Sequence, residues 1–103
     1  MNTTLPVLCG GSPLDDAEAE ELAARFKALA DPTRVAIVNR LGTADEVCVC
    51  ELNAELDLSQ PTVSHHLKVL REAGLVASTR RGTWAYYRLV DESLQQLRQT
   101  LGG

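Results

Sequence analysis

The stretch LSQPTVSHHLKVLREAGL, residues 58–75, constrains the fold of this chain more than any other segment. Ser59 is a typical helix N-cap, Pro61 fits the opening turn of a helix, and Gly74 is a typical stop after its C-terminus. The apolar residues that recur at helical spacing are Val63, Leu67 and Leu70. Because such residues form one stripe of a helix, the segment predicts an amphipathic helix with one buried face.

The rest of the chain divides at similar capping signals and predicts one small domain. We expect helices over residues 14–30, 32–41, 48–56 and 91–101 in addition to the one that Ser59 caps. After Gly74 the apolar period changes from helical to alternating, and LVASTRRGTWAYYRLV predicts a hairpin that turns at Arg81-Gly82. The order predicts a mainly α fold with one β-hairpin, a winged helix-turn-helix. Residues 1–14 are expected to be a flexible tail and residues 15–103 the folded domain.

Charge is distributed unevenly along the chain. The net charge is −4, yet residues 59–88 hold five basic residues and one acidic residue, whereas residues 1–58 hold four basic and eleven acidic residues. A local basic region can bind phosphates whatever the sum over the whole chain. Duplex DNA is therefore a candidate partner.

The exposed face of the helix after Ser59 has the composition of a DNA-reading helix. Its polar residues are Gln60, Thr62, Ser64, His65, Lys68 and Arg71. Short polar side chains near the N-terminus of such a helix can contact base edges in the major groove, and the later cations can contact phosphates. A solvated surface helix has a similar pattern, but the tight turn DLS before it and the hairpin after it favour a DNA reader. Arg80 and Arg81 are expected to contact the neighbouring DNA backbone or minor groove.

The aromatic residues of the hairpin, Trp84, Tyr86 and Tyr87, are expected to pack the wing rather than stack on bases. Neighbouring residues on a helix diverge by about 100°, so His65 and His66 are poor partners for one metal. We expect His65 to face DNA and His66 to pack.

Four blocks of the sequence resemble the corresponding blocks of the ArsR/SmtB family of metalloregulatory repressors: ALADPTRVAIVNRL, VCVCEL, LSQPTVSHHLKVLREAGLV and RRGTWAYYRL. The likeness covers about residues 22–90. It implies a homodimer with its interface on the first and last helices, repression by binding to an inverted repeat, and release of DNA when a toxic ion binds. It also implies that Gln60, Ser64 and His65 contact bases.

Cys48 and Cys50, in DEVCVCEL, are the candidate ligands of such an ion because thiolates are soft donors that suit thiophilic ions. On a regular helix their side chains would point about 200° apart, whereas in an extended segment they would share a face. The pair can hold one ion only if the helix start unwinds or is already extended. Binding there would act on the helix that directly precedes the DNA-reading one.

Other roles for the cysteines stay open. Interleaved with Val47 and Val49, Cys48 and Cys50 also fit a buried apolar stretch. Cys9 is an idle thiol, a third ligand or the disulfide partner of either cysteine, and the last of these would make a redox switch. A disulfide within the pair itself would be strained.

The resemblance also narrows the choice of ion. The pair matches the one that arsenic-responsive members use for arsenite and antimonite, As(III) and Sb(III). Many of those members have a further cysteine where this chain has Asn53, which makes Cys9 the available third ligand. Cadmium and lead sensors of the family typically supply four thiolates. Three cysteines fit As(III) or Sb(III) better and leave Cd(II) and Pb(II) as alternatives, and the final helix has no histidine for a zinc- or nickel-type site.

No enzyme signature is present in the sequence: it has no glycine-rich phosphate loop, no Ser-His-Asp arrangement and no HExxH. No apolar run approaches the roughly 20 residues that cross a bilayer. Three cysteines without a framework of spacings indicate a reducing, cytoplasmic compartment. We expect a protein that is not an enzyme and has no permanent cofactor, with a cytosolic thiol-metal buffer as the alternative that does not bind DNA.

Overall fold

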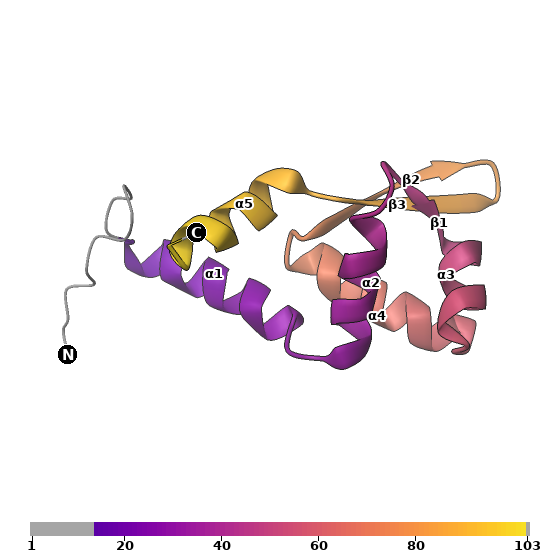
Figure 1. The fold of residues 1–103 in the computed structure, drawn as a ribbon, viewed down its shortest axis with the longest axis horizontal. Helices are drawn as coiled ribbons and strands as arrows, with labels where there is room; N and C mark the ends of the chain where they lie inside the picture. Colours follow the sequence, from indigo (N-terminus) through magenta and orange to yellow (C-terminus); the bar gives the residue numbers. More distant parts are fainter. Residues whose placement is uncertain (1–13, 103) are drawn as a thin grey trace.

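The computed structural model describes residues 14–102. Its elements are α1 (Asp16–Ala28), α2 (Pro32–Leu41), β1 (Val47–Cys48), α3 (Val49–Leu56), α4 (Gln60–Glu72), β2 (Val76–Arg81), β3 (Trp84–Leu89) and α5 (Asp91–Thr100). Figure 1 shows α2, α3 and α4 packed together beneath the β2–β3 hairpin, as in a winged helix-turn-helix. The predicted fold class is confirmed, and the prediction lacked only the short strand β1.

Capping side chains set the helix boundaries. Asp15 accepts the N–H of Glu18 at 2.7 Å while the Glu18 carboxylate accepts the N–H of Asp15 at 3.0 Å, which closes a capping box. This cap starts α1 two residues later than predicted. Asp31 accepts the N–H groups of Thr33 and Arg34 and starts α2, as predicted.

The three strands form one antiparallel sheet in the order β1-β3-β2. β1 pairs with β3 so that Val47 lies opposite Tyr87 and Cys48 opposite Tyr86. Between β2 and β3, Arg81 pairs with Trp84, so the turn consists of Gly82 and Thr83. The turn lies one residue later than predicted because its first central position has a φ of +63°, which glycine adopts without strain.

The core lies between the sheet and helices α2, α3 and α4. Its largest fully buried side chains are Ile37, Leu41, Val47, Leu52, Val63, Leu67, Leu70 and Leu75. The three residues predicted to face the core from α4 are among them. Their burial fixes the rotation of α4 about its axis, so the opposite, polar face is directed to solvent.

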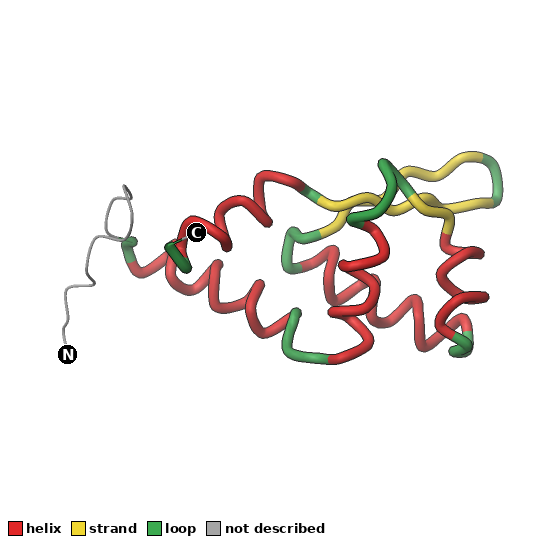
Figure 2. The backbone as a smooth tube through the Cα atoms, viewed as in Figure 1, coloured by secondary structure: helices red, strands yellow, loops and turns green. Residues whose placement is uncertain are grey.

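Helices α1 and α5 form an arm that extends away from this core. Figure 2 shows the two helices running beside each other at the end of the molecule opposite the hairpin. The Arg25 side chain joins them to α4: its Nε donates to the Ala73 carbonyl at 3.0 Å, and its Nη1 donates to Gln96 Oε1 at 2.5 Å. The radius of gyration is 15.4 Å, above the value of about 13 Å for a compact domain of 100 residues.

Within the described residues, none of the helices has both the length and the apolar composition needed to span a membrane.

Candidate functional site

All six polar residues predicted for the DNA-reading face of α4 are exposed, namely Gln60, Thr62, Ser64, His65, Lys68 and Arg71. They share one helix, and its buried side holds them in fixed register. The side chains therefore form one continuous surface that begins at the N-terminal end of α4, as direct readout in a major groove requires.

The turn before α4 depends on one unusual backbone conformation. Asp57 ends α3 in the left-handed region, with φ 54° and ψ 43°. Aspartate tolerates this region better than most residues, and it lets the chain reverse direction within two residues. Ser59 then caps α4, accepting the N–H of Thr62 at 3.3 Å and donating its hydroxyl proton to Thr62 Oγ1 at 2.8 Å. Thr62 thus helps to hold the cap and keeps its own O–H available to donate.

The two adjacent histidines have different surroundings. His65 is exposed, whereas His66 is half-buried with its Nδ1 3.1 Å from Arg34 Nη1. A guanidinium group can only donate, so Nδ1 of His66 is the acceptor in this contact. The same Arg34 donates its Nε–H to the Ala28 carbonyl at 2.6 Å. The prediction that His66 packs is confirmed.

The two hairpin arginines, both predicted to contact DNA, have different surroundings. Side chains alternate across a strand, so Arg80 and Arg81 lie on opposite faces of β2. The guanidinium of Arg81 makes a two-point ion pair with Glu46 and lies 4.7 Å from the Tyr86 ring centroid. Hydrogen bonding to the Glu46 carboxylate raises the pKa of Arg81 above its usual range. Arg80 is exposed and has no polar partner within residues 14–102.

The cysteine pair lies where the sheet passes into α3. Cys48 is the last residue of β1 and the N-cap of α3, with an extended backbone (φ −69°, ψ 140°), and Cys50 is in the first turn. The Cys50 thiol donates to Cys48 Sγ at 2.6 Å, and the Cys50 N–H donates to the same sulfur at 3.4 Å. For the pair to hold one ion, the helix start had either to unwind or to be extended already, and the structure has the extended start. The sulfurs lie together without unwinding of the helix.

The two thiols differ in access and in acidity. Cys48 is 6% exposed, whereas Cys50 is exposed. The hydrogen bond to Cys48 raises the pKa of the Cys50 thiol above its usual range, and desolvation acts in the same direction. An electrophile therefore meets Cys50 first and Cys48 second.

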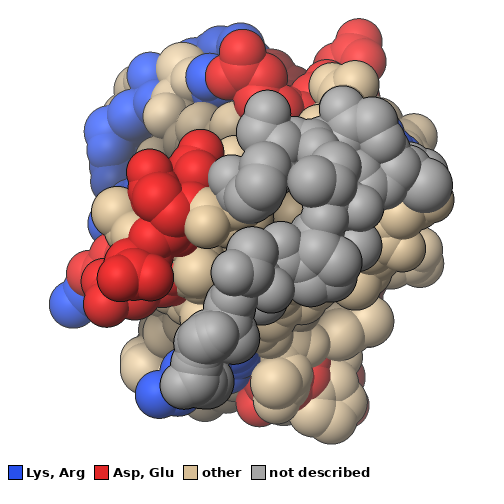
Figure 3. All heavy atoms as spheres, turned by 90° about the vertical axis from the view of Figure 1, so that its left-hand side faces the viewer, with Lys and Arg blue, Asp and Glu red and all other residues tan. Residues whose placement is uncertain are grey.

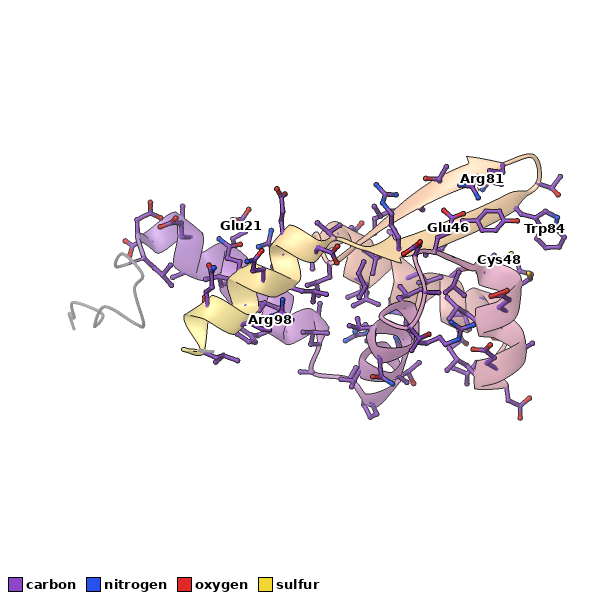
Figure 4. All side chains as sticks on the ribbon, turned by 45° about the horizontal axis from the view of Figure 1, so that its top comes forward. Glu21, Glu46, Cys48, Arg81, Trp84 and Arg98 are labelled. Atoms are coloured by element: carbon purple, nitrogen blue, oxygen red, sulfur yellow. The ribbon has the colours of Figure 1, made fainter. Side chains whose placement is uncertain are left out.

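The surroundings of the pair were not predicted from the sequence. Residues directly opposite in a sheet share a face, so Tyr86 lies beside Cys48, and Trp84 is the diagonal neighbour on that face. Figure 4 shows Trp84 and Cys48 at the same end of the molecule, with Glu46 and Arg81 pointing toward each other nearby. The only signal in the sequence was the alternation of the β3 aromatics, which does not reveal their partner strand.

Within residues 14–102 no third histidine, cysteine, aspartate or glutamate completes a metal site with the pair. The predicted third ligand, Cys9, lies outside the described residues.

Three comparisons with known proteins agree. The model of the bacterial regulatory protein arsR family matches residues 31–78. An uncharacterised HTH-type transcriptional regulator of Methanocaldococcus jannaschii is 42% identical over 78 residues, 76% of this chain and 88% of its own. The arsenical resistance operon repressor of Bacillus subtilis is 38% identical over 87 residues, 82% of this chain and 83% of its own.

A solved structure is similar over most of the fold. The homodimeric winged helix-turn-helix DNA-binding domain of a possible ArsR-family regulator from Mycobacterium bovis has a TM-score of 0.71 and 27% identity, covering 85% of this chain and 84% of that one. Fold, DNA-reading helix and sequence similarity lead to one assignment. The chain belongs to the ArsR family of winged helix-turn-helix transcriptional repressors, which are regulators and not enzymes.

Proposed function

We propose that this protein is a cytoplasmic repressor that binds an inverted-repeat operator as a dimer and leaves it when Cys48 and Cys50 bind arsenite or antimonite. The observation that carries the proposal is the contact between the two sulfurs at the start of α3. A soft donor pair of this kind selects thiophilic ions. It lies in the helix-turn-helix itself, where a ligand can act on DNA binding directly.

On the DNA side, we propose that Gln60, Ser64 and His65 contact base edges and that Lys68 and Arg71 contact phosphates. The exposure of these side chains and the N-terminal position of the short polar ones support these roles. Thr62 supports the helix start and donates to the DNA backbone. Arg80 contacts a phosphate from the hairpin, whereas Arg81 must first give up Glu46.

The release step follows from placing an ion between the two sulfurs. An ion bonded to both sulfurs replaces the thiol proton that Cys50 donates to Cys48, so the start of α3 has to accommodate it. Cys48 is held by its strand pairing with Tyr86, so Cys50 and the first turn of α3 must move. α3 packs on α4, and the displacement alters the docking of the DNA-reading helix.

The dimer is supported by the arm of α1 and α5. Phe26 and Leu101 are 36% and 73% exposed there, a poor arrangement for large apolar side chains in a monomer. Figure 3 views the molecule from this end, where acidic and basic side chains lie mainly on one side and uncharged residues make up most of the other. The homodimeric relative from Mycobacterium bovis supports the same conclusion.

The test is a gel-shift titration on the protein's own promoter fragment with arsenite, antimonite, cadmium, lead and zinc added in turn. Wild-type protein should leave the DNA with arsenite or antimonite. Cys48→Ser and Cys50→Ser should bind the DNA nearly as well but stay bound. Serine is the right replacement because a serine N-cap keeps α3 capped.

Each other result identifies a different function. Release by cadmium or lead alone would assign the site to those ions. Release by peroxide alone, lost in Cys9→Ser, would indicate the redox switch. Thiol binding of the ions without any salt-sensitive DNA binding would indicate a metal buffer.

A further inference from the structure

We propose that Arg34 and His66 are positioning residues for DNA binding: their contact fixes the angle between the arm and the DNA-reading helix α4, and so the half-site spacing that the dimer accepts. The inference rests on the proposed function, because it concerns a dimer on an inverted repeat. It begins from the short joint, residues 29–31, that separates α1 in the arm from α2 in the core.

One guanidinium group joins three helices at this joint. Arg34 lies in the first turn of α2, where its Nε donates to the carbonyl of Ala28, the last residue of α1, at 2.6 Å. Its Nη1 donates to Nδ1 of His66 on α4 at 3.1 Å. The carbonyl of Ala28 would ordinarily accept the N–H of the residue four positions on, but that residue is Pro32, which has no N–H. Arg34 supplies the missing donor, and its rigid, planar fork directs a second N–H to His66.

The packing between α1 and α4 leaves this angle to polar contacts. The two helices face each other across a shallow hollow of about 290 Å³, lined in part by the short side chains of Ala24, Ala28 and Ala73. Side chains this short do not interlock as deeply as larger ones, so they define the crossing angle of two helices poorly. The hydrogen bonds of Arg34, and that of Arg25 to the Ala73 carbonyl at the end of α4, therefore hold the arm in place.

A small change of this angle is large on the scale of DNA. α1 has 13 residues and is about 20 Å long, so a rotation of about 10° at its base moves its far end by about 3.5 Å. Successive base pairs lie about 3.4 Å apart and are rotated by about 35°. In a dimer joined through its arms, the angle therefore sets the distance between the two α4 helices to within about one base pair.

The experiment measures the preference for half-site spacing. Promoter fragments carry the repeat at its natural spacing, with one base pair removed or added between the half-sites, or a single half-site, and each is titrated with the full chain. His66→Leu keeps a bulky side chain at this half-buried position but cannot accept from Arg34. It should bind the single half-site within about twofold of wild type, lose about tenfold on the natural repeat, and bind the three spacings with nearly equal affinity.

Two further variants separate positioning from a general loss of stability. The amide oxygen of asparagine lies where Nδ1 lies on histidine, so His66→Asn should restore most of the preference for the natural spacing. Arg34→Lys keeps the charge but replaces the fork by a single nitrogen, so it should behave like His66→Leu. It also takes the place of His66→Leu if circular dichroism shows that His66→Leu does not fold.

The comparison of half-site and repeat decides the outcome. If His66→Leu and Arg34→Lys weakened binding to both by the same factor, the contact would only stabilise α4, and the inference would be overturned. Wild-type spacing preference in both variants would also overturn it, because the arm would then be positioned without the contact. Either result leaves the proposed function standing. A wild-type chain that bound the repeat no more tightly than a single half-site would contradict the proposed dimer as well.

Discussion

At the scale of single residues, Cys50 offers the most direct prediction. Its hydrogen bond to Cys48 raises its thiol pKa, so the neutral form should persist to higher pH than in a free cysteine. In a Cys9→Ser background, Cys48→Ala removes that partner and should shift the midpoint of Cys50 alkylation by iodoacetamide to lower pH. Circular dichroism checks that α3 is intact. Identical midpoints in the two proteins would mean that the sulfurs are not in contact.

Ser64 and His65 carry the second prediction at this scale. Changing either to alanine should relax base preference at one position per half-site, at a cost of about 1–3 kcal/mol. Lys68→Ala is the matched control on the same face, and it should weaken binding to all duplexes alike. Selection from a randomised operator library measures the difference. A change of base preference in Lys68→Ala but not in the other two would reverse the roles.

Residue properties that depend on helical periodicity could be predicted from the sequence, and those that depend on distant partners could not. The exposure of the α4 polar face and the burial of Leu67 follow from spacing alone. The ion pair of Arg81 joins residues 35 positions apart. The sulfur contact depends on the backbone of Cys48, which its pairing with Tyr86 holds extended. No local pattern contains either fact.

At the scale of elements, the hairpin predicts an asymmetry between its arginines. Arg80→Ala should weaken binding to every duplex. It should also lower the steepness of log affinity against log salt concentration (the salt slope) by about one unit, as expected for one lost phosphate contact. Arg81→Ala should change the slope less, because Glu46 already neutralises that guanidinium. Glu46→Gln should raise the salt slope, because it frees the Arg81 guanidinium to bind a phosphate. Binding isotherms at several salt concentrations measure all three, and equal slopes for Arg80→Ala and Arg81→Ala would contradict the asymmetry.

The element that the sequence did not predict is β1, and its length explains why. Two residues, Val47 and Cys48, are too short to show an alternating pattern, and the strand exists because β3 has an open edge to pair with. This short strand nevertheless connects the hairpin to α3. A ligand bound to Cys48 and Cys50 would therefore act on both the hairpin sheet and α3, whereas the sequence suggested α3 alone.

At the scale of the whole molecule, shape and surface together predict the assembly. The principal extents are 47 × 24 × 20 Å, because the arm of α1 and α5 extends from the winged core. An arm of two helices with exposed apolar residues covers little of its own surface. A second copy packed on it by a two-fold axis would bury these residues and place two α4 helices on one side of the DNA.

Leu101→Glu therefore provides the final prediction. A charge at this 73% exposed position should not unfold the monomer, but it should disrupt an apolar dimer interface. Val35→Glu on α2, at a position 50% exposed and outside both helices of the arm, is the matched control and should stay dimeric. Sedimentation velocity at micromolar concentration distinguishes the two. Because a dimer binds both half-sites at once, Leu101→Glu should lose about a hundredfold or more in affinity for the inverted repeat and little for an isolated half-site. If Leu101→Glu sediments as a dimer, the arm is not the interface, and the two half-sites must be bridged by another surface.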